Sequence, residues 1–103
     1  MRVTITARHC DLSNDLRARA RELVGRLAKV AGRSHDASVL FREEHGVALV
    51  EVRLHTSRSR VYVGTAENGD HRSALDLAVA RVRRQLDKPP VRRRPARSVR
   101  EVS

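Results

Sequence analysis

Apolar and polar side chains alternate between residues 36 and 67, and this period of two constrains the fold more than any other feature of the chain. Such alternation is typical of strands that bury one face. A turn at Glu44-His45-Gly46 and a polar connection at 56–59 divide the region, so we expect an antiparallel meander of three strands. The predicted inward side chains are Ala37, Val39 and Phe41, then Ala48, Val50, Val52 and Leu54, and finally Val61, Val63 and Thr65.

Two further elements precede the meander. Residues 3–7 alternate in the same way and predict a half-buried first strand. Apolar residues then recur at helical spacing from 13 to 31. Ser13 is the expected N-cap of this helix, with Asp15 near the positive end of its dipole, and Gly32 is the expected C-cap.

The segment Gly69–Lys88 predicts a second helix, with Asp70 as its N-cap. Four apolar side chains share one face of this helix, namely Leu75, Val79, Val82 and Leu86. A ladder of cations about one turn apart occupies another face, namely Arg81, Arg84 and Lys88. No acidic residue lies four positions before Arg81 or Arg84, so we expect both side chains to be free of intrahelical ion pairs and to point away from the core.

The order of elements is therefore β-α-β-β-β-α. Because each strand has one apolar face, both helices are expected to pack on the same face of a four-stranded sheet, in an α+β fold. Residues 1–88 form this domain. Residues 89–103 contain three prolines and five arginines, and we expect them to form a flexible basic tail.

The charge of the chain indicates a polyanionic partner. The formal net charge is +10 and the isoelectric point is near 11.5, values typical of proteins that bind nucleic acids. The helical segments carry the excess of positive charge. Residues 13–31 contain five basic and two acidic residues, and residues 70–88 contain five basic and three acidic residues. Residues 36–67, in contrast, contain four basic and five acidic residues. Aromatic residues make up 2% of the chain, too few for a module that stacks on unpaired bases.

Six cations are candidates for contacting phosphates. On the first helix, three of them lie along one flank of the apolar stripe. If the two helices run side by side, these three and the ladder on the second helix meet in a single cleft-like patch. The candidates are Arg19, Arg26 and Lys29 on the first helix and Arg81, Arg84 and Lys88 on the second.

Other chemistry has little support in the sequence. The five histidines stand in different elements without metal-ligand spacing, and the chain lacks a glycine-rich phosphate loop, a nucleophile elbow or a pair of catalytic carboxylates. We therefore expect no catalytic residues, no metal and no cofactor. Cys10 is the single cysteine, and the chain has neither an apolar leader nor an apolar run of about 18 residues, so a cytoplasmic location is expected.

Two stretches carry a family resemblance over residues 3–88. The first is VTITARHCDLSNDLRARARELVGRLAKV, and the second is VYVGTAENGDHRSALDLAVARVRRQLDK, whose RRQLDK ending is the most specific part. They resemble the opening strand, cap and first helix, and the last strand, acidic turn and second helix, of the ribosome hibernation-promoting factor family. Members of this family are also called ribosome-associated inhibitors and sigma-54 modulation proteins.

The resemblance implies a double-stranded-RNA-binding-like fold and a site on 16S rRNA, between the head and body of the small ribosomal subunit. There, members of the family occupy the channel of mRNA and tRNA and hold the ribosome idle during stress or stationary phase. The family's rRNA-contacting cations match Arg26, Arg81, Arg84 and Lys88 in this chain. Arg19 and Lys29 are candidates from helix geometry alone.

The chain departs from the family pattern in two places. His71-Arg72-Ser73 stands where members often carry an aromatic residue, and the chain is similar to the short form, without the dimerisation domain of long members. Whether it promotes ribosome dimers or only idles single ribosomes stays open, as does its own oligomeric state. Two other functions also stay open, namely a general double-stranded RNA or DNA-binding module and a domain whose basic face meets an acidic protein. Neither a membrane nor a small-molecule substrate is expected as a partner.

Overall fold

The computed structural model describes residues 1–32, 34–56 and 60–87. The order of elements is the predicted one, which confirms the α+β class. Lys88 and the predicted tail at 89–103 lie outside the described residues. The elements are β1 (Arg2–Arg8), α1 (Asn14–Ala31), β2 (Ser34–Glu44), β3 (Val47–Thr56), β4 (Val61–Asn68) and α2 (His71–Asp87).

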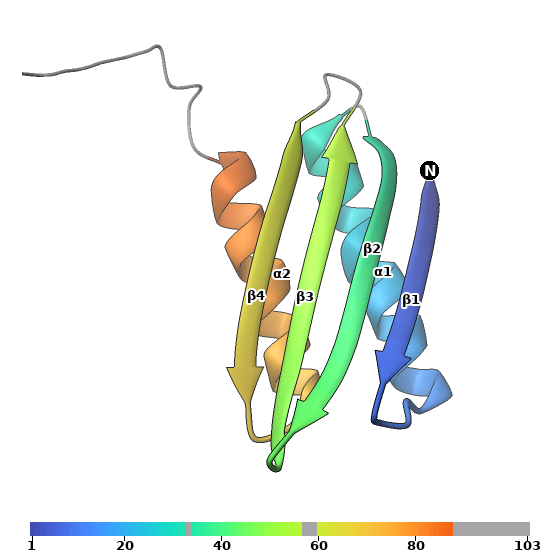
Figure 1. Ribbon diagram of the computed structural model, residues 1–103. Coiled ribbons are helices and arrows are strands. Elements are labelled where there is room, and N and C mark those ends of the chain that lie inside the picture. Colours follow the sequence, from blue (N-terminus) through green and yellow to red (C-terminus); the bar gives the residue numbers. More distant parts are fainter. Residues whose placement is uncertain (33, 57–59, 88–103) are drawn as a thin grey trace, which may run out of the picture.

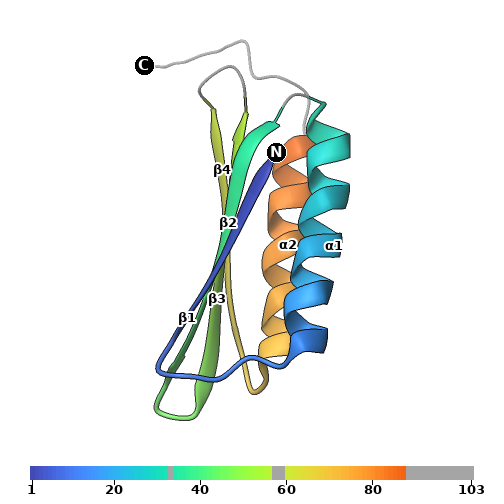
Figure 2. The ribbon, with the colours of Figure 1, turned by 90° about the vertical axis from the view of Figure 1, so that its right-hand side faces the viewer.

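The four strands form one sheet in the order β1-β2-β3-β4. β1 pairs with β2 in parallel, because α1 carries the chain back between them, and the other pairs are antiparallel. Both helices cover one face of the sheet and run in the same direction, as Figures 1 and 2 show from two sides. The predicted packing of both helices on one face is therefore confirmed, and the opposite face is open.

Local signals end the elements where the sequence predicts. Ser13 caps α1 through its Oγ, which accepts a hydrogen bond from the backbone N–H of Leu16 at 3.1 Å, and Gly32 closes the helix at a φ of 84°. His45 and Gly46 join β2 to β3 with φ values of 52° and 78°. Two consecutive positive φ values are those of the tight hairpin turn whose twist matches the strands.

The core lies between the sheet and the two helices. Among the described residues, every buried side chain is apolar, and the largest are Phe41, Leu27, Leu54 and Leu75. The predicted inward faces of β2 and β3 are confirmed, since each of those residues is at most 2% exposed. On α2, Leu75 and Val82 are fully buried, while Val79 and Leu86 pack partly buried against the same cluster.

β4 turns the face opposite to the predicted one toward the core. Val61 is 47% exposed and Thr65 is exposed, whereas Gly64 and Ala66 are buried. The reason is the close approach of α2, because a Cβ at Gly64 would lie 2.3 Å from the carbonyl oxygen of Ala78. Only small side chains fit beneath the helix there, so the β-branched residues of this strand lie on the open face.

Candidate nucleic-acid interface

Arg26 lies on the exposed side of the helical layer. Its Nη2 donates a hydrogen bond to Glu22 at 2.9 Å, one turn earlier in α1, and its side chain is 66% exposed. Ion pairs of this kind contribute only about 0.3–0.5 kcal/mol on a solvated helix. A phosphate can therefore replace Glu22 at little cost, and Arg26 stays available to an anionic ligand.

Lys29 and Arg84 are the candidates with the freest charges. Both side chains are exposed, and neither forms an ion pair within the described part of the chain. The expectation that Arg84 forms no intrahelical ion pair is therefore confirmed for those residues. A cation without a partner can bind a phosphate at little cost in free energy, since no existing contact has to be broken first.

Arg19 is held between the two helices. Its Nε and Nη2 donate to the two carboxylate oxygens of Asp76 in α2, each at 3.0 Å, and its side chain is only 32% exposed. These hydrogen bonds raise the pKa of the Arg19 guanidinium above its ordinary value. Because Asp76 already neutralises it in a bidentate pair, Arg19 links α1 to α2 and offers less charge to a ligand than the helical wheel predicts.

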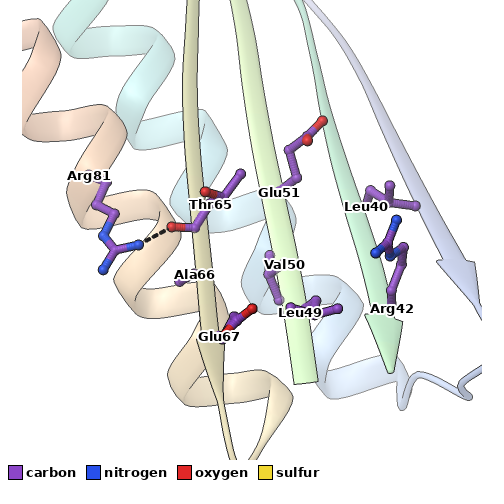
Figure 3. A pocket seen from close by; sticks show the side chains of 9 residues that line it. All are labelled: Leu40, Arg42, Leu49, Val50, Glu51, Thr65, Ala66, Glu67 and Arg81. Atoms are coloured by element: carbon purple, nitrogen blue, oxygen red, sulfur yellow. Dashed lines mark hydrogen bonds between the residues drawn. The ribbon is translucent and has the colours of Figure 1, made fainter. Parts of the chain in front are cut away.

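Arg81 lies on the flank of α2 that faces the free edge of β4. Its guanidinium donates to the backbone carbonyl oxygen of Thr65, as the dashed line in Figure 3 marks. Arg81 is exposed and points away from the core, as predicted, but it bends along the edge of the sheet and bonds to β4, a contact that the sequence did not predict. Arg81 directly precedes the fully buried Val82, so its side chain starts at the border of the buried stripe, although it forms no intrahelical ion pair in the described segments.

The open face of the sheet next to Arg81 has a shallow hollow of about 470 Å³. Leu40, Leu49 and Thr65 line it together with the carboxylates of Glu51 and Glu67 (Figure 3). Arg42 and Arg81 line it as well and balance the two carboxylates, so the hollow has no excess of positive charge to extend the candidate interface onto the open face.

The predicted single patch is therefore divided by α2. Arg19 contacts the flank of α2 that faces α1, and Arg81 lies on the opposite flank, against β4. Arg26 and Lys29 remain exposed on α1, while Arg84 is exposed on the β4 side of α2, where it lines a hollow together with Arg81. A wheel drawn for each helix alone does not show which flank meets which neighbour, and this explains the difference.

Arg72 and Arg83 were not among the cations predicted from the sequence to contact phosphates. Both lie on the flank of α2 that faces α1, together with Asp76. Arg72 is exposed and lines, with Arg19, a groove of about 600 Å³ between the first turns of the two helices. Arg83 forms an ion pair with Asp87 at 3.2 Å. The signal was present in the sequence, since positions 72, 76 and 83 are separated by steps of four and seven.

The first turn of α2 is anchored by two adjacent residues. The predicted cap is confirmed, because Asp70 Oδ1 accepts the backbone N–H of Ser73 at 2.7 Å. This bond and the Ser73 hydroxyl lower the pKa of the Asp70 carboxyl. His71 follows, with its ring 5.9 Å from that of Phe41 and its Nε2 3.0 Å from the carbonyl oxygen of Arg42. His71 thus provides packing at the position where the family resemblance implies an aromatic residue.

Neither a metal site nor a membrane-spanning helix is found within the described ranges. No group of three or more His, Cys, Asp or Glu side chains is placed to hold a metal ion there. None of the described helices is both long and apolar enough to cross a membrane.

The family model described as sigma 54 modulation protein / S30EA ribosomal protein matches residues 3–94 of the chain. The chain belongs to this family. The match covers most of the sequence and confirms the resemblance found in the opening strand and in the second helix. No curated protein matches the chain significantly.

Two solved structures have a similar fold. A ribosomal subunit interface protein from Coxiella burnetii has a TM-score of 0.76 and 19% sequence identity, covering 84% of this chain and 93% of that chain. The N-terminal domain of Protein Y from Thermus thermophilus has a TM-score of 0.73 and 19% identity, covering 84% and 96%. At this identity the likeness establishes the fold of this S30EA family member.

Proposed function

We propose that the protein binds the small ribosomal subunit at 16S rRNA in the decoding region and inhibits translation by occupying the sites of mRNA and tRNA. The observation that carries the proposal is the family match over residues 3–94. The description of one structural neighbour as a ribosomal subunit interface protein supports the same assignment.

The proposed contact surface is the outer side of the helical layer. Arg26, Lys29 and Arg84 are exposed there, and Lys88 is proposed to continue the ladder beyond α2. Their spacing along two parallel helices suits the regular charges of a folded RNA backbone, so shape and phosphate position, more than base edges, would select the site. Arg19 and Arg81 would contribute only where a phosphate competes with Asp76 or with the Thr65 carbonyl.

Inhibition would then follow from occupancy. A folded domain bound across the decoding region excludes mRNA and tRNA without any covalent step, and no catalytic residue is required. Such a protein would act in the cytoplasm and keep ribosomes idle during stress or stationary phase, and it would dissociate when ionic or cellular conditions weaken the phosphate contacts.

Co-sedimentation with purified ribosomes and separated subunits on sucrose gradients tests the proposal. We expect the protein to travel with the small subunit and with intact ribosomes, to resist competition by naked duplex RNA, and to dissociate as salt rises. Displacement by duplex RNA at equal concentration would instead identify a general duplex-binding module. Absence from every ribosomal fraction would overturn the proposal and favour an acidic protein partner.

A further inference from the structure

Two side chains of α2 close the free edge of β4. Arg81 donates to the carbonyl oxygen of Thr65, and Gln85 Nε2 donates to that of Val63 at 2.6 Å. Residues two apart in a strand direct their backbone groups to the same side, so both carbonyls point away from β3. An unpaired edge normally offers alternating N–H and C=O groups to another strand. On β4, α2 already occupies two of these acceptors.

β4 has few other features that would prevent it from pairing with a strand of another molecule. Its sequence contains no proline, its single charged residue is Glu67, and Val61, Val63 and Thr65 are β-branched residues that favour strands. The opposite edge of the sheet differs, because β1 begins and ends with the arginines Arg2 and Arg8. Charges at both ends of an edge strand discourage association. The protection of β4 must therefore come from outside the strand.

We propose that Arg81 and Gln85 act as a guard that keeps β4 from pairing with the β4 strand of a second copy of this chain. The guard works by occupation, since a second strand would need the Thr65 and Val63 carbonyls as acceptors. This role is independent of the proposed binding to ribosomes.

The sequence of β4 suits pairing with itself once the carbonyls are free. In an antiparallel pair centred on Gly64, Val63 lies opposite Thr65 and Val61 lies opposite Glu67 of the other copy, so no like charges meet. Such a pair would continue the sheet with both helical layers on one side. The two α2 helices would then be neighbours, and repulsion between their arginines is a second obstacle that Arg81 provides.

The test compares an Arg81→Met/Gln85→Met double variant with Arg84→Met. Methionine matches the length of Gln85 and the aliphatic part of Arg81 and removes the donors, while Arg84→Met removes the same single charge from α2 and leaves both carbonyl contacts in place. Sedimentation velocity over a concentration series should give the chain mass of 11.6 kDa for the wild type and the control, and twice this mass for the double variant as concentration rises.

Hydrogen exchange locates the new contact. In the double variant the backbone N–H groups of Val63 and Thr65 should gain protection with concentration, while β1 stays unchanged. A folded double variant that remains monomeric, a control that dimerises equally, or protection that appears at β1 in place of β4 would each overturn the proposal. If the double variant loses its fold, the single variant Gln85→Met tests the proposal, because it frees the carbonyl oxygen of Val63. It should dimerise at higher concentration, and a strictly monomeric Gln85→Met protein would contradict the guard.

Discussion

Gly64 determines how closely α2 lies on the sheet. A Cβ at this position would be 2.3 Å from the Ala78 carbonyl oxygen and 2.9 Å from Val82 Cγ2. The first of these neighbours is helix backbone and cannot rotate away, so the whole helix must shift to admit a methyl group. The position of the cations on α2 therefore depends on this contact together with the buried side chains of the helix.

Gly64→Ala should therefore destabilise the protein by about 1–3 kcal/mol, the usual cost of an overpacked core. Urea unfolding followed by circular dichroism measures the change. Gly25→Ala is the matched control, because nothing lies within 4 Å of a Cβ there and Gly25 stands inside α1. The control should gain roughly 0.5–1 kcal/mol from helix propensity. Equal stability of Gly64→Ala and the wild type would contradict the close packing.

The Asp70 cap predicts a dependence of stability on pH. Its hydrogen bonds from Ser73 lower the pKa of the carboxyl in the folded protein. The stability that the carboxylate contributes is therefore fully present above the unfolded pKa of Asp, near 3.9, and is lost as pH falls through the lower folded pKa.

Asp70→Asn keeps a capping oxygen but does not titrate. The difference in Tm between wild type and Asp70→Asn should be constant from pH 7 to about 5 and should decrease below about pH 4. Thermal unfolding across this range measures it. Because both proteins share every other acidic group, the comparison isolates Asp70, and a difference that stays constant down to pH 2 would show that the carboxylate charge has no part in the cap.

The two helices are joined by the bidentate contact of Arg19 with Asp76. This contact fixes α1 beside α2 and at the same time withdraws one cation from the outer surface. Arg26 and Arg83 are paired with acids of their own helices at the solvent-exposed surface. The helical layer is thus less charged than a count of its arginines suggests, and Asp76 would limit its attraction for a polyanion.

Asp76→Asn should strengthen binding to ribosomes several-fold at low salt, because it removes a negative charge and releases Arg19. Asp36→Asn is the control, since it makes the same change of charge on the open face of the sheet, next to His55. Binding isotherms at two salt concentrations measure both variants. The advantage of Asp76→Asn should fade at high salt, and an equal gain from Asp36→Asn would show that net charge alone matters.

The two faces of the molecule differ in how their charges are balanced. On the open face, Arg42 pairs with Glu44 and Arg53 with Glu51. On the helical face, Lys29 and Arg84 stand without an acidic partner among the residues that the structure describes. Arg2 and Arg8 on β1 also form no ion pair among the described residues, but the helices carry more of the unpaired cations, so we expect a polyanion to be attracted mainly to the helical side.

A Lys29→Ala/Arg84→Ala variant should lower the slope of log K against log salt by roughly 1.4–1.8, since each lost phosphate contact removes about 0.7–0.9. Arg2→Ala/Arg8→Ala removes the same charge from exposed positions of β1 that face away from the helices. We expect this control to change the slope far less. A salt series of ribosome binding measures both, and equal slopes for the two variants would contradict a one-sided interface.

Most of the fold was predictable because its signals are local. The period of two in β1, β2 and β3 and the helical period of α1 and α2 depend on neighbouring residues, as do the caps at Ser13, Gly32 and Asp70. β4 was the exception. Its inward face follows from the contact of Gly64 with α2, which involves residues 14 or more positions away and leaves no period in the strand itself.

The amino-acid sequence by itself determined the order of the elements, their ends, and the excess of positive charge on the helices. Only the tertiary structure decided which cations are exposed without a partner and which are bound to other parts of the domain. The rotation of each helix about its axis is set by packing between distant segments, so Arg19 meets Asp76 across 57 positions and Arg81 meets Thr65 across 16. Candidate cations that look alike in the sequence therefore differ in the structure. Arg19 links the two helices, Arg81 belongs to the proposed guard of the sheet edge, and Lys29 and Arg84 form no ion pair among the described residues.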